Sequence, residues 1–208
     1  MKKICFITTS RADFSTLNEL IKETTKKNFF RIQLIISGSH NNKIFGTTNK
    51  EIKSNKKYQI KKIKLNLKNK DAKSVAFSFS QCVNKFSKAL NELKPDLFIV
   101  FGDRYEMFAA SIAAYVLRIP IVHIAGGEKT IGSLDDGFRH SITKLSCLHF
   151  PTMKIYRKRL IQLGENPKSV FVVGGLGVDG IKRLKLLSRE ELETSLGIKF
   201  NEKNLIVT

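Results

Sequence analysis

The chain has 208 residues, of which 42% are hydrophobic, and it carries a formal net charge of +19. This length and composition fit a globular protein with one large domain, or one domain and part of another, and exclude a disordered or fibrous protein. No apolar run approaches the roughly 20 residues of a membrane-spanning helix, so we expect no membrane segment. The charge comes from 28 lysines against 9 arginines. Because aromatic residues are not interleaved with this charge, it predicts a solvated lysine-rich surface rather than a nucleic-acid-binding protein.

The amino-terminal segment MKKICFITTSRAD contains an apolar run that is too short for a signal peptide. We interpret this run as a first buried strand. The three cysteines, Cys5, Cys82 and Cys147, are widely spaced and form no CxxC pair. This usage indicates free thiols and a cytoplasmic location.

Short apolar runs rich in Ile, Val and Phe alternate with longer stretches of helical spacing. The runs predict strands covered on both faces at residues 4–8, 32–37, 97–101, 121–124 and 170–173. Apolar residues repeat every three or four positions over residues 14–21 and 75–90, which predicts two amphipathic helices. This alternation predicts an α/β fold, a parallel Rossmann-like sheet sandwiched between helices.

Two regions are assigned from composition. Residues 41–70 are rich in Lys and Asn, and we interpret them as a lid-like loop with a short helix and one strand. The glycine-rich sequence GGLGVDG indicates a domain exit, which divides the chain into an amino-terminal domain at 1–180 and a segment at 181–208. That segment is predicted to hold a helix at 181–187, a second helix beginning at a Ser188–Glu191 capping box, and the first strand of a truncated second domain.

Asp103 and Arg104 follow the apolar run 97–101 after a single glycine, Gly102. At the end of a parallel strand these side chains would project into the ligand-binding edge of the sheet. Arginine can bind a phosphate with two hydrogen bonds, and a carboxylate can transfer protons to or from a sugar. The alternative is a helix-capping aspartate beside a surface arginine.

The stretch from 123 to 144 concentrates ionisable residues after the next predicted strand: His123, Glu128, Asp135, Asp136, Arg139 and His140. Either Asp135 or Asp136 is expected to cap a helix on which positions 136, 139, 140 and 143 share one face. Such a cluster suits proton transfer beside an anion. The alternative is a loop with a capping aspartate and a structural His–Asp hydrogen bond. No spacing typical of metal ligands is present, and we predict no metal or cofactor.

Arg11 and Ser15 lie four residues apart at the start of the first predicted helix, where a phosphate would be favoured. No GxGxxG fingerprint stands at this first strand-to-helix junction, and no GxxxxGK[ST] loop occurs in the sequence, which argues against dinucleotide-dependent dehydrogenases and P-loop nucleotidases.

At these places the sequence resembles the hydrolysing UDP-N-acetylglucosamine 2-epimerases, which make N-acetylmannosamine for sialic-acid-like sugars. The matching stretches are TSRADFS, KPDLFIVFGDRYEMFAASIAAYVLRIPIVHIAGGE, DDGFRHSITKLSCLHF and IQLGENPKSVFVVGGLGVD. They cover most of residues 1–180 in the family's order. The resemblance implies the first half of a two-domain glycosyltransferase-B-like fold. It also implies a UDP- or GDP-linked N-acetylhexosamine as substrate and a homo-oligomer at full length.

The resemblance also assigns roles to individual residues. Arg11, Ser15 and Arg104 would bind the nucleotide diphosphate, with His123 and Arg139 as further substrate-binding residues. The carboxylates Asp103, Glu128, Asp135 and Asp136, together with His140, would be catalytic. Several members of the family carry a carboxylate where this chain has Ala125. The family's second domain supplies a further histidine, so the 208-residue chain alone is expected to turn over poorly.

Three alternatives remain open at this level. The same fold would serve a glycosyltransferase or a non-hydrolysing epimerase, although the RHSITK and HIAGGE stretches favour the hydrolysing class. A truncated chain could bind a sugar nucleotide without catalysis. Nucleic-acid binding is the most distant of the three.

Overall fold

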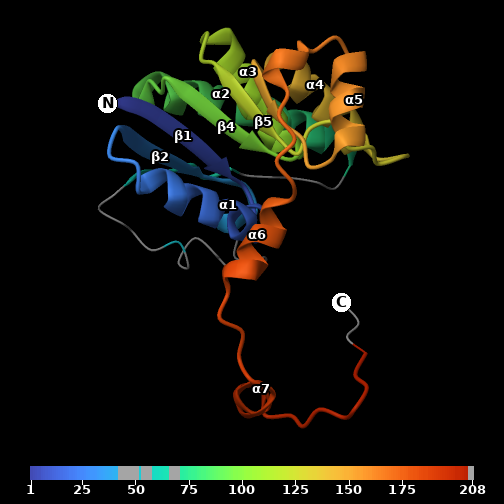
Figure 1. The fold of residues 1–208 in the computed structure, drawn as a ribbon. Helices are drawn as coiled ribbons and strands as arrows, with labels where there is room; N and C mark the ends of the chain where they lie inside the picture. Colours follow the sequence, from blue (N-terminus) through green and yellow to red (C-terminus); the bar gives the residue numbers. More distant parts are fainter. Residues whose placement is uncertain (42–51, 53–57, 66–70, 206–208) are drawn as a thin grey trace.

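Six parallel strands form a sheet at the centre of the computed structural model, which describes residues 1–41, 52, 58–65 and 71–205 (Figure 1). Their order across the sheet is β3-β2-β1-β4-β5-β6. The strands are β1 (Lys2–Thr8), β2 (Phe30–Ile36), β3 (Tyr58–Lys62), β4 (Leu97–Phe101), β5 (Ile121–Ile124) and β6 (Leu148–Phe150). This order places the first strand in the middle, as in doubly wound sheets, and the predicted Rossmann-like α/β fold is confirmed.

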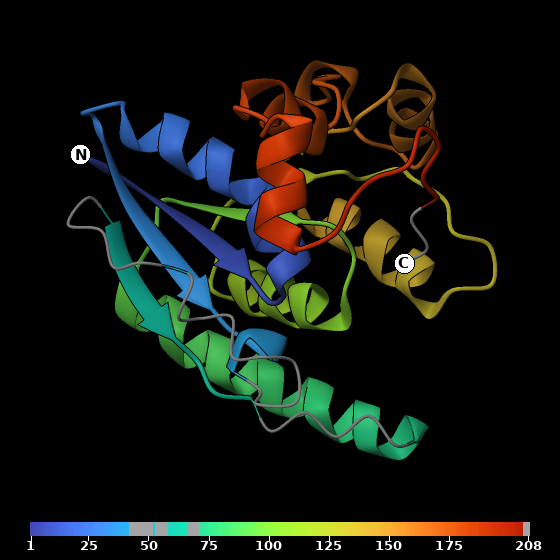
Figure 2. The same ribbon diagram turned by 90° about the horizontal axis from the view of Figure 1, so that it is seen from below.

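Helices connect the strands and pack on both faces of the sheet (Figures 1 and 2). The helices are α1 (Arg11–Thr25), α2 (Ala72–Leu93), α3 (Tyr105–Val116), α4 (Leu134–Leu145), α5 (Lys154–Gln162), α6 (Leu176–Arg183) and α7 (Arg189–Leu196), with short 3₁₀ turns at Gly38–Asn41 and Pro167–Ser169. Of these, α7 lies apart from the sheet (Figure 1). Among the described residues, no helix is both long enough and apolar enough to span a bilayer.

The alternating side chains of the strands build two apolar cores. On one face, Cys5 and Val100 of the sheet pack against Phe86 of α2, Met107 of α3 and Ile142 of α4. The other face is covered mainly by α1, whose buried Leu17 and Ile21 contact the opposite side of the same strands. Because both faces are covered, the strands are apolar throughout and show no polar alternation, which explains the sequence pattern.

Four of the five predicted strands occur, and one prediction was wrong. Residues 170–173 form no strand: Val170 makes an isolated bridge to His149, and Phe171 and Val173 donate backbone hydrogen bonds to carbonyls of the β6 region. The strand beside them, β6, was missed because its three residues include a histidine and give too short an apolar signal. In the region 41–70, the strand β3 is present, and most of the predicted lid lies outside the described residues.

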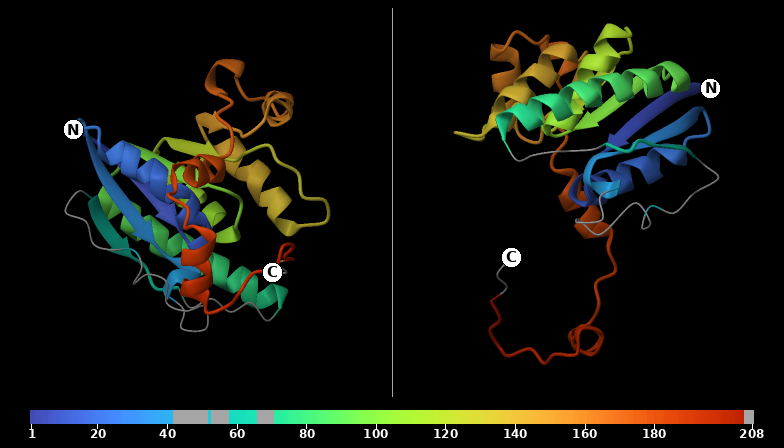
Figure 3. Two further views of the ribbon diagram at one scale, coloured as in Figure 1. Left: turned by 60° about the horizontal axis from the view of Figure 1, so that its bottom comes forward. Right: turned by 180° about the vertical axis from the view of Figure 1, so that it is seen from behind.

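The carboxyl-terminal segment departs from the predicted boundaries. The helix expected at 181–187 begins earlier, so that α6 starts at Leu176 within the glycine-rich sequence and lies beside α1 (Figures 1 and 3). The capping box of Ser188 and Glu191 at the start of α7 is confirmed. Residues 206–208 of the predicted final strand lie outside the described residues. The division into two domains at 180/181 stays a prediction.

Because all six strands run in the same direction, their carboxyl ends meet at one edge of the sheet. The loops that follow β1, β4 and β5 carry the ionisable residues singled out in the sequence. In open parallel sheets ligands bind at this edge.

Candidate active site

Arg139 lies at the centre of the charged cluster at the carboxyl edge. Its side chain is 7% exposed, and its guanidinium donates to the carboxylate of Asp103, which follows β4, and to that of Asp136, one turn earlier in α4 (3.1 Å). It also donates to Oγ1 of Thr130 in the loop after β5 (3.1 Å). A buried charge of this kind is stable only when it is paired. Arg139 therefore joins two predicted carboxylates that are 33 positions apart in sequence.

Asp136 is the most connected carboxylate of the cluster. Besides Arg139, it accepts a hydrogen bond from the backbone N–H of Thr130 (2.8 Å), and its other oxygen lies 3.6 Å from Nε2 of His140. The Thr130 N–H, with smaller contributions from His140 and Arg139, lowers the pKa of Asp136 below its ordinary value. Asp136 is therefore ionised at neutral pH, and its carboxylate lies beside the imidazole of His140.

The expectation that Asp135 or Asp136 caps α4 was wrong. The cap is Ser133, whose hydroxyl accepts from the N–H of Asp135 (3.2 Å). Both aspartates lie instead in the first turn of α4, where the partial positive charge of the helix end stabilises carboxylates. The shared face of positions 136, 139, 140 and 143 is borne out by the contacts of their side chains.

His123 lies beneath this cluster and is fully buried. Nε2 lies 3.0 Å from the carbonyl oxygen of Gly102, and Nδ1 lies 3.0 Å from Oγ1 of Thr143. Burial lowers the pKa of His123 to about 3, so the ring is neutral. Since a carbonyl only accepts, Nε2 donates to Gly102, and Nδ1 accepts from the Thr143 hydroxyl. Both ring nitrogens of His123 are engaged inside the protein, and its role in binding substrate stays a prediction.

Two glycines let the chain pass close to this histidine. A Cβ atom on Gly126 would lie 2.9 Å from Nδ1 of His123 and 3.1 Å from Oγ1 of Thr143. Gly127 has a φ of +82°, and a Cβ there would lie 2.7 Å from the carbonyl oxygen of Tyr156 in α5. The glycine pair is therefore required by close packing between the β5 loop, α4 and α5.

Glu128 follows the glycine pair and lies at the same edge of the sheet. It is half-buried, and one of its oxygens accepts a hydrogen bond from the hydroxyl of Thr152, just after β6 (3.1 Å). The contacts of the described residues do not link it directly to Arg139. Glu128 thus lies at the same edge of the sheet, but its side-chain contact is with Thr152 and not with the Arg139 cluster.

The loop from β1 into α1 is organised by a carboxylate that the sequence reasoning did not single out. One oxygen of the buried Asp13 accepts from the N–H and hydroxyl of Thr9 (2.8 and 2.9 Å) and from the N–H of Ser10 (3.1 Å). Ser10 caps α1. Arg11 and Ser15 lie in the first turns of α1, as predicted, and both are exposed.

Arg104 is the N-cap residue directly before α3, and it is bonded to a residue that the sequence reasoning missed. Its guanidinium donates to Glu106 through Nη2 (3.0 Å) and Nε (3.3 Å). The sequence signal that could have identified Glu106 is its position as the lone charged residue in the apolar helical sequence YEMFAASIAAYV. Thr130 was also missed, since it lies in a loop without periodicity.

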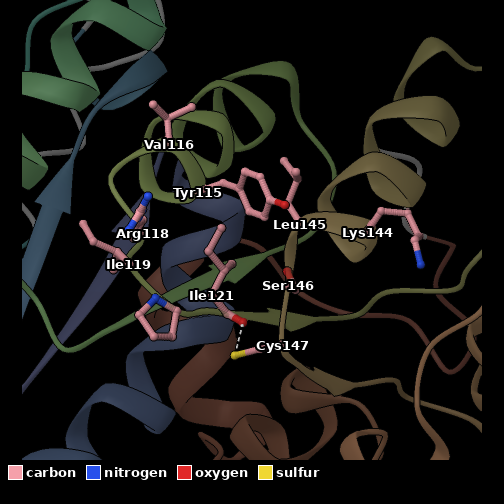
Figure 4. Close-up of a pocket in the computed structure, with 10 residues that line it drawn as sticks. Tyr115, Val116, Arg118, Ile119, Ile121, Lys144, Leu145, Ser146 and Cys147 are labelled. Atoms are coloured by element: carbon pink, nitrogen blue, oxygen red, sulfur yellow. Dashed lines mark hydrogen bonds between the residues drawn. The ribbon is translucent and has the colours of Figure 1, made fainter.

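A cavity of about 720 Å³ lies away from this edge, where α3 and α4 end and β5 begins. Figure 4 shows that it is lined by residues such as Tyr115, Ile119 and Leu145, and that Cys147 donates to the carbonyl of Ile121 (3.3 Å). None of the predicted site residues lines it. The chemistry is therefore sought at the carboxyl edge and not in this cavity.

The sheet order and the loops at its carboxyl edge define a Rossmann-like α/β domain of the kind that forms one half of a glycosyltransferase-B fold. The model of the family described as UDP-N-acetylglucosamine 2-epimerase matches residues 22–208. The chain belongs to this family.

Relatives and solved structures agree with this assignment. The chain is 40% identical over 208 residues to the GDP/UDP-N,N'-diacetylbacillosamine 2-epimerase (hydrolyzing) of Campylobacter jejuni, covering 100% of this chain and 54% of the relative. It is 32% identical over 203 residues to the UDP-N,N'-diacetylbacillosamine 2-epimerase (hydrolyzing) of Legionella pneumophila, covering 98% of this chain and 54% of the relative. The crystal structure of UDP-GlcNAc 2-epimerase from Neisseria meningitidis bound to UDP-GlcNAc has a TM-score of 0.75 at 21% identity, covering 94% of this chain and 54% of that one. The chain thus spans about half the length of the relatives it matches.

Proposed function

We propose that the protein is a hydrolysing sugar-nucleotide 2-epimerase, which converts a UDP- or GDP-linked N-acetylhexosamine into a free N-acetylmannosamine-type sugar and the nucleoside diphosphate. The single observation that supports this most is the cluster in which Arg139 joins Asp103 and Asp136 at the carboxyl edge of the sheet. Family membership and the hydrolysing relatives support the reaction type.

The proposed reaction needs two proton transfers at the sugar. A base removes the proton from C2, the C1–O bond breaks with departure of the nucleoside diphosphate, and a double bond forms between C1 and C2. Water then adds across that bond: C1 receives the hydroxyl group and C2 receives a proton on the opposite face. Carboxylates and a histidine can supply these transfers when they lie beside the sugar. Asp103, Asp136, His140, Asp135 and Glu128 are the proposed catalytic residues.

The diphosphate is proposed to bind between the starts of α1 and α3. Arg11 and Ser15 lie in the first turns of α1, where the helix end favours an anion. Arg104 precedes α3 and is about half-exposed. Arginine is well suited to hold phosphate oxygens through paired hydrogen bonds.

For His123 and Arg139 we propose positioning roles in place of direct substrate binding. His123 holds the carbonyl of Gly102 and thereby the turn that presents Asp103. Arg139 is almost fully buried, and its hydrogen bonds fix the two carboxylates relative to each other. Neither side chain needs to leave its protein partners for the proposed chemistry.

The relatives suggest which sugars to test. Their names give GDP- or UDP-N,N'-diacetylbacillosamine for one relative and UDP-N,N'-diacetylbacillosamine for another. A diacetamido sugar nucleotide is therefore proposed beside UDP-N-acetylglucosamine, with a place in the synthesis of sialic- or legionaminic-acid-type sugars. Cytoplasmic location and assembly into homo-oligomers are proposed with it.

A second candidate function is binding of a sugar nucleotide without turnover by this 208-residue chain. It is favoured by the coverage of 54% of the first relative. UDP binding without product formation by the 208-residue chain would support this second function for the chain alone. Turnover by the complete gene product would support the main proposal for the whole protein.

The test of the main proposal uses Asp103→Asn in the complete gene product. We expect release of UDP to fall by at least about 100-fold, the scale typical of a lost proton-transfer group, with folding unchanged by circular dichroism. Asp96→Asn is a matched control, because Asp96 is an exposed carboxylate that bonds Lys2 and the N–H of Lys3 near the start of β1. NMR analysis of products from a panel of UDP- and GDP-sugars identifies the substrate. Near-normal turnover by Asp103→Asn would remove this residue from the mechanism.

A further inference from the structure

The helix α3 buries a single carboxylate in an otherwise uncharged sequence. Glu106 lies in its first turn and is 0% exposed, while the following helix residues are mostly alanines and larger apolar side chains. Burying an ionised carboxylate without a partner costs several kcal/mol or more, so such a residue is retained only with compensating interactions. The position near the helix amino terminus offers part of that compensation.

The main compensation is Arg104. Glu106 accepts from Nη2 through one oxygen (3.0 Å) and from Nε through the other (3.3 Å). These two donors form one edge of the guanidinium. The second edge, formed by Nη1 and the remaining N–H of Nη2, is not used by Glu106 and has the spacing that suits two oxygens of a phosphate.

The place of Arg104 in the site follows from the order of the strands, and its charge is stabilised by its surroundings. Burial acts to lower the pKa of Arg104, but its bonds to Glu106 and the smaller effect of the Asp13 charge raise it above the ordinary value. Because β4 pairs with β1 in parallel, Arg104, which follows β4, lies beside the start of α1, where Arg11 and Ser15 are found. The side chain of Arg104 is 43% exposed, in contrast to 7% for Arg139, whose donors serve Asp103, Asp136 and Thr130.

We propose that Glu106 is a positioning residue for diphosphate binding: it holds Arg104 by one edge so that the other edge binds the phosphate oxygens of the sugar nucleotide. This inference rests on the proposed function and adds to it a residue that does not itself touch the substrate. Without Glu106 the arginine side chain would sample several rotamers, and binding would have to order it.

The test compares Glu106→Gln, Glu106→Asp and the control Glu92→Gln in the complete gene product. Glu92 is an exposed carboxylate of α2 that pairs with Lys61 outside the site. UDP affinity is measured by isothermal titration calorimetry, KM and kcat with the sugar nucleotide, and folding by thermal denaturation. We expect Glu106→Gln to weaken UDP binding and raise KM about 10-fold, the loss for one poorly oriented charged contact, with kcat within about 3-fold. Glu106→Asp keeps the charge but shortens the side chain, and it should show a smaller loss.

A further comparison separates positioning from a general structural role. In an Arg104→Ala background, Glu106→Gln should change UDP affinity by less than about 2-fold, because the residue through which Glu106 acts is gone. An equal loss in both backgrounds, or a fall in kcat with unchanged KM, would overturn the inference. If Glu106→Gln does not fold, the inference is tested with Glu106→Asp instead. Wild-type UDP affinity and wild-type KM in Glu106→Asp would overturn the inference. Failure of the wild-type protein to bind UDP or turn over any sugar nucleotide would instead refute the proposed function.

Discussion

The packing of Gly126 against His123 leads to a quantitative prediction for Gly126→Ala. The added Cβ would lie 2.9 Å from Nδ1 of His123 and 3.1 Å from Oγ1 of Thr143, and neither atom belongs to the free end of a flexible side chain. Moving either atom breaks their 3.0 Å hydrogen bond, which is buried. Leaving a buried polar group unsatisfied costs about 1–3 kcal/mol, and overpacking adds about 1–3 kcal/mol. We therefore expect a loss of about 2–6 kcal/mol in the free energy of unfolding.

The matched control is Gly137→Ala, which lies in α4. A Cβ at Gly137 meets no described heavy atom within 4 Å, and its φ lies outside the left-handed region. Alanine has the higher helix propensity, so this variant should gain about 0.4–1 kcal/mol. Urea denaturation at pH 7, followed by circular dichroism, measures both. A Gly126→Ala variant within about 0.5 kcal/mol of wild type, the usual range for surface changes, would refute the packing argument.

Two further predictions concern titration and thiols. Because burial lowers the pKa of His123 from 6.5 to about 3, the stability it provides is fully present above pH 6.5. This stability is lost as the pH falls from 6.5 towards about 3, at about 1.4 kcal/mol per pH unit. Urea denaturation between pH 7 and 5 measures the slope of the unfolding free energy against pH. An equal slope in His123→Asn would contradict the prediction. Burial raises the pKa of the Cys5 thiol and, together with the charge of Glu106, raises that of Cys82 to about 12, whereas Cys147 is exposed. Labelling with a thiol reagent at pH 8 should therefore modify Cys147 rapidly and the other two only on unfolding; rapid loss of all three thiols would contradict the burial.

The sheet was largely predictable from sequence because its strands are buried on both faces and form continuous apolar runs. The failures have a common cause in tertiary context. β6 is only three residues long and contains His149, so its apolar signal is weak. Residues 170–173 are apolar enough for a strand. They lie beside β6 at the edge of the sheet, but they make too few backbone hydrogen bonds with it to form a strand. The start of α6 inside a glycine-rich sequence contradicts local propensity, and contact with α1 offers a physical reason for it.

The candidate site was predictable to the level of strand ends but not to the level of side-chain contacts. The sequence placed Asp103 and Asp136 after neighbouring strands, and parallel topology then brought them together. Whether a charged residue faces the ligand or lies beneath it depends on burial, which the sequence does not state. His123 is the clearest example, since its ionisable ring is closed off by Gly102 and Thr143. The roles of the site residues stay predictions until the variants are measured.

The measurement that tests the central claim most directly is turnover of the sugar nucleotide by the complete gene product in deuterated water, followed by proton NMR. If the carboxyl-edge cluster removes the proton from C2 and solvent later returns one, the free sugar should carry deuterium at C2 and one nucleoside diphosphate should be released per sugar. Release of the diphosphate with the original hydrogen retained at C2 would show simple hydrolysis and contradict the account.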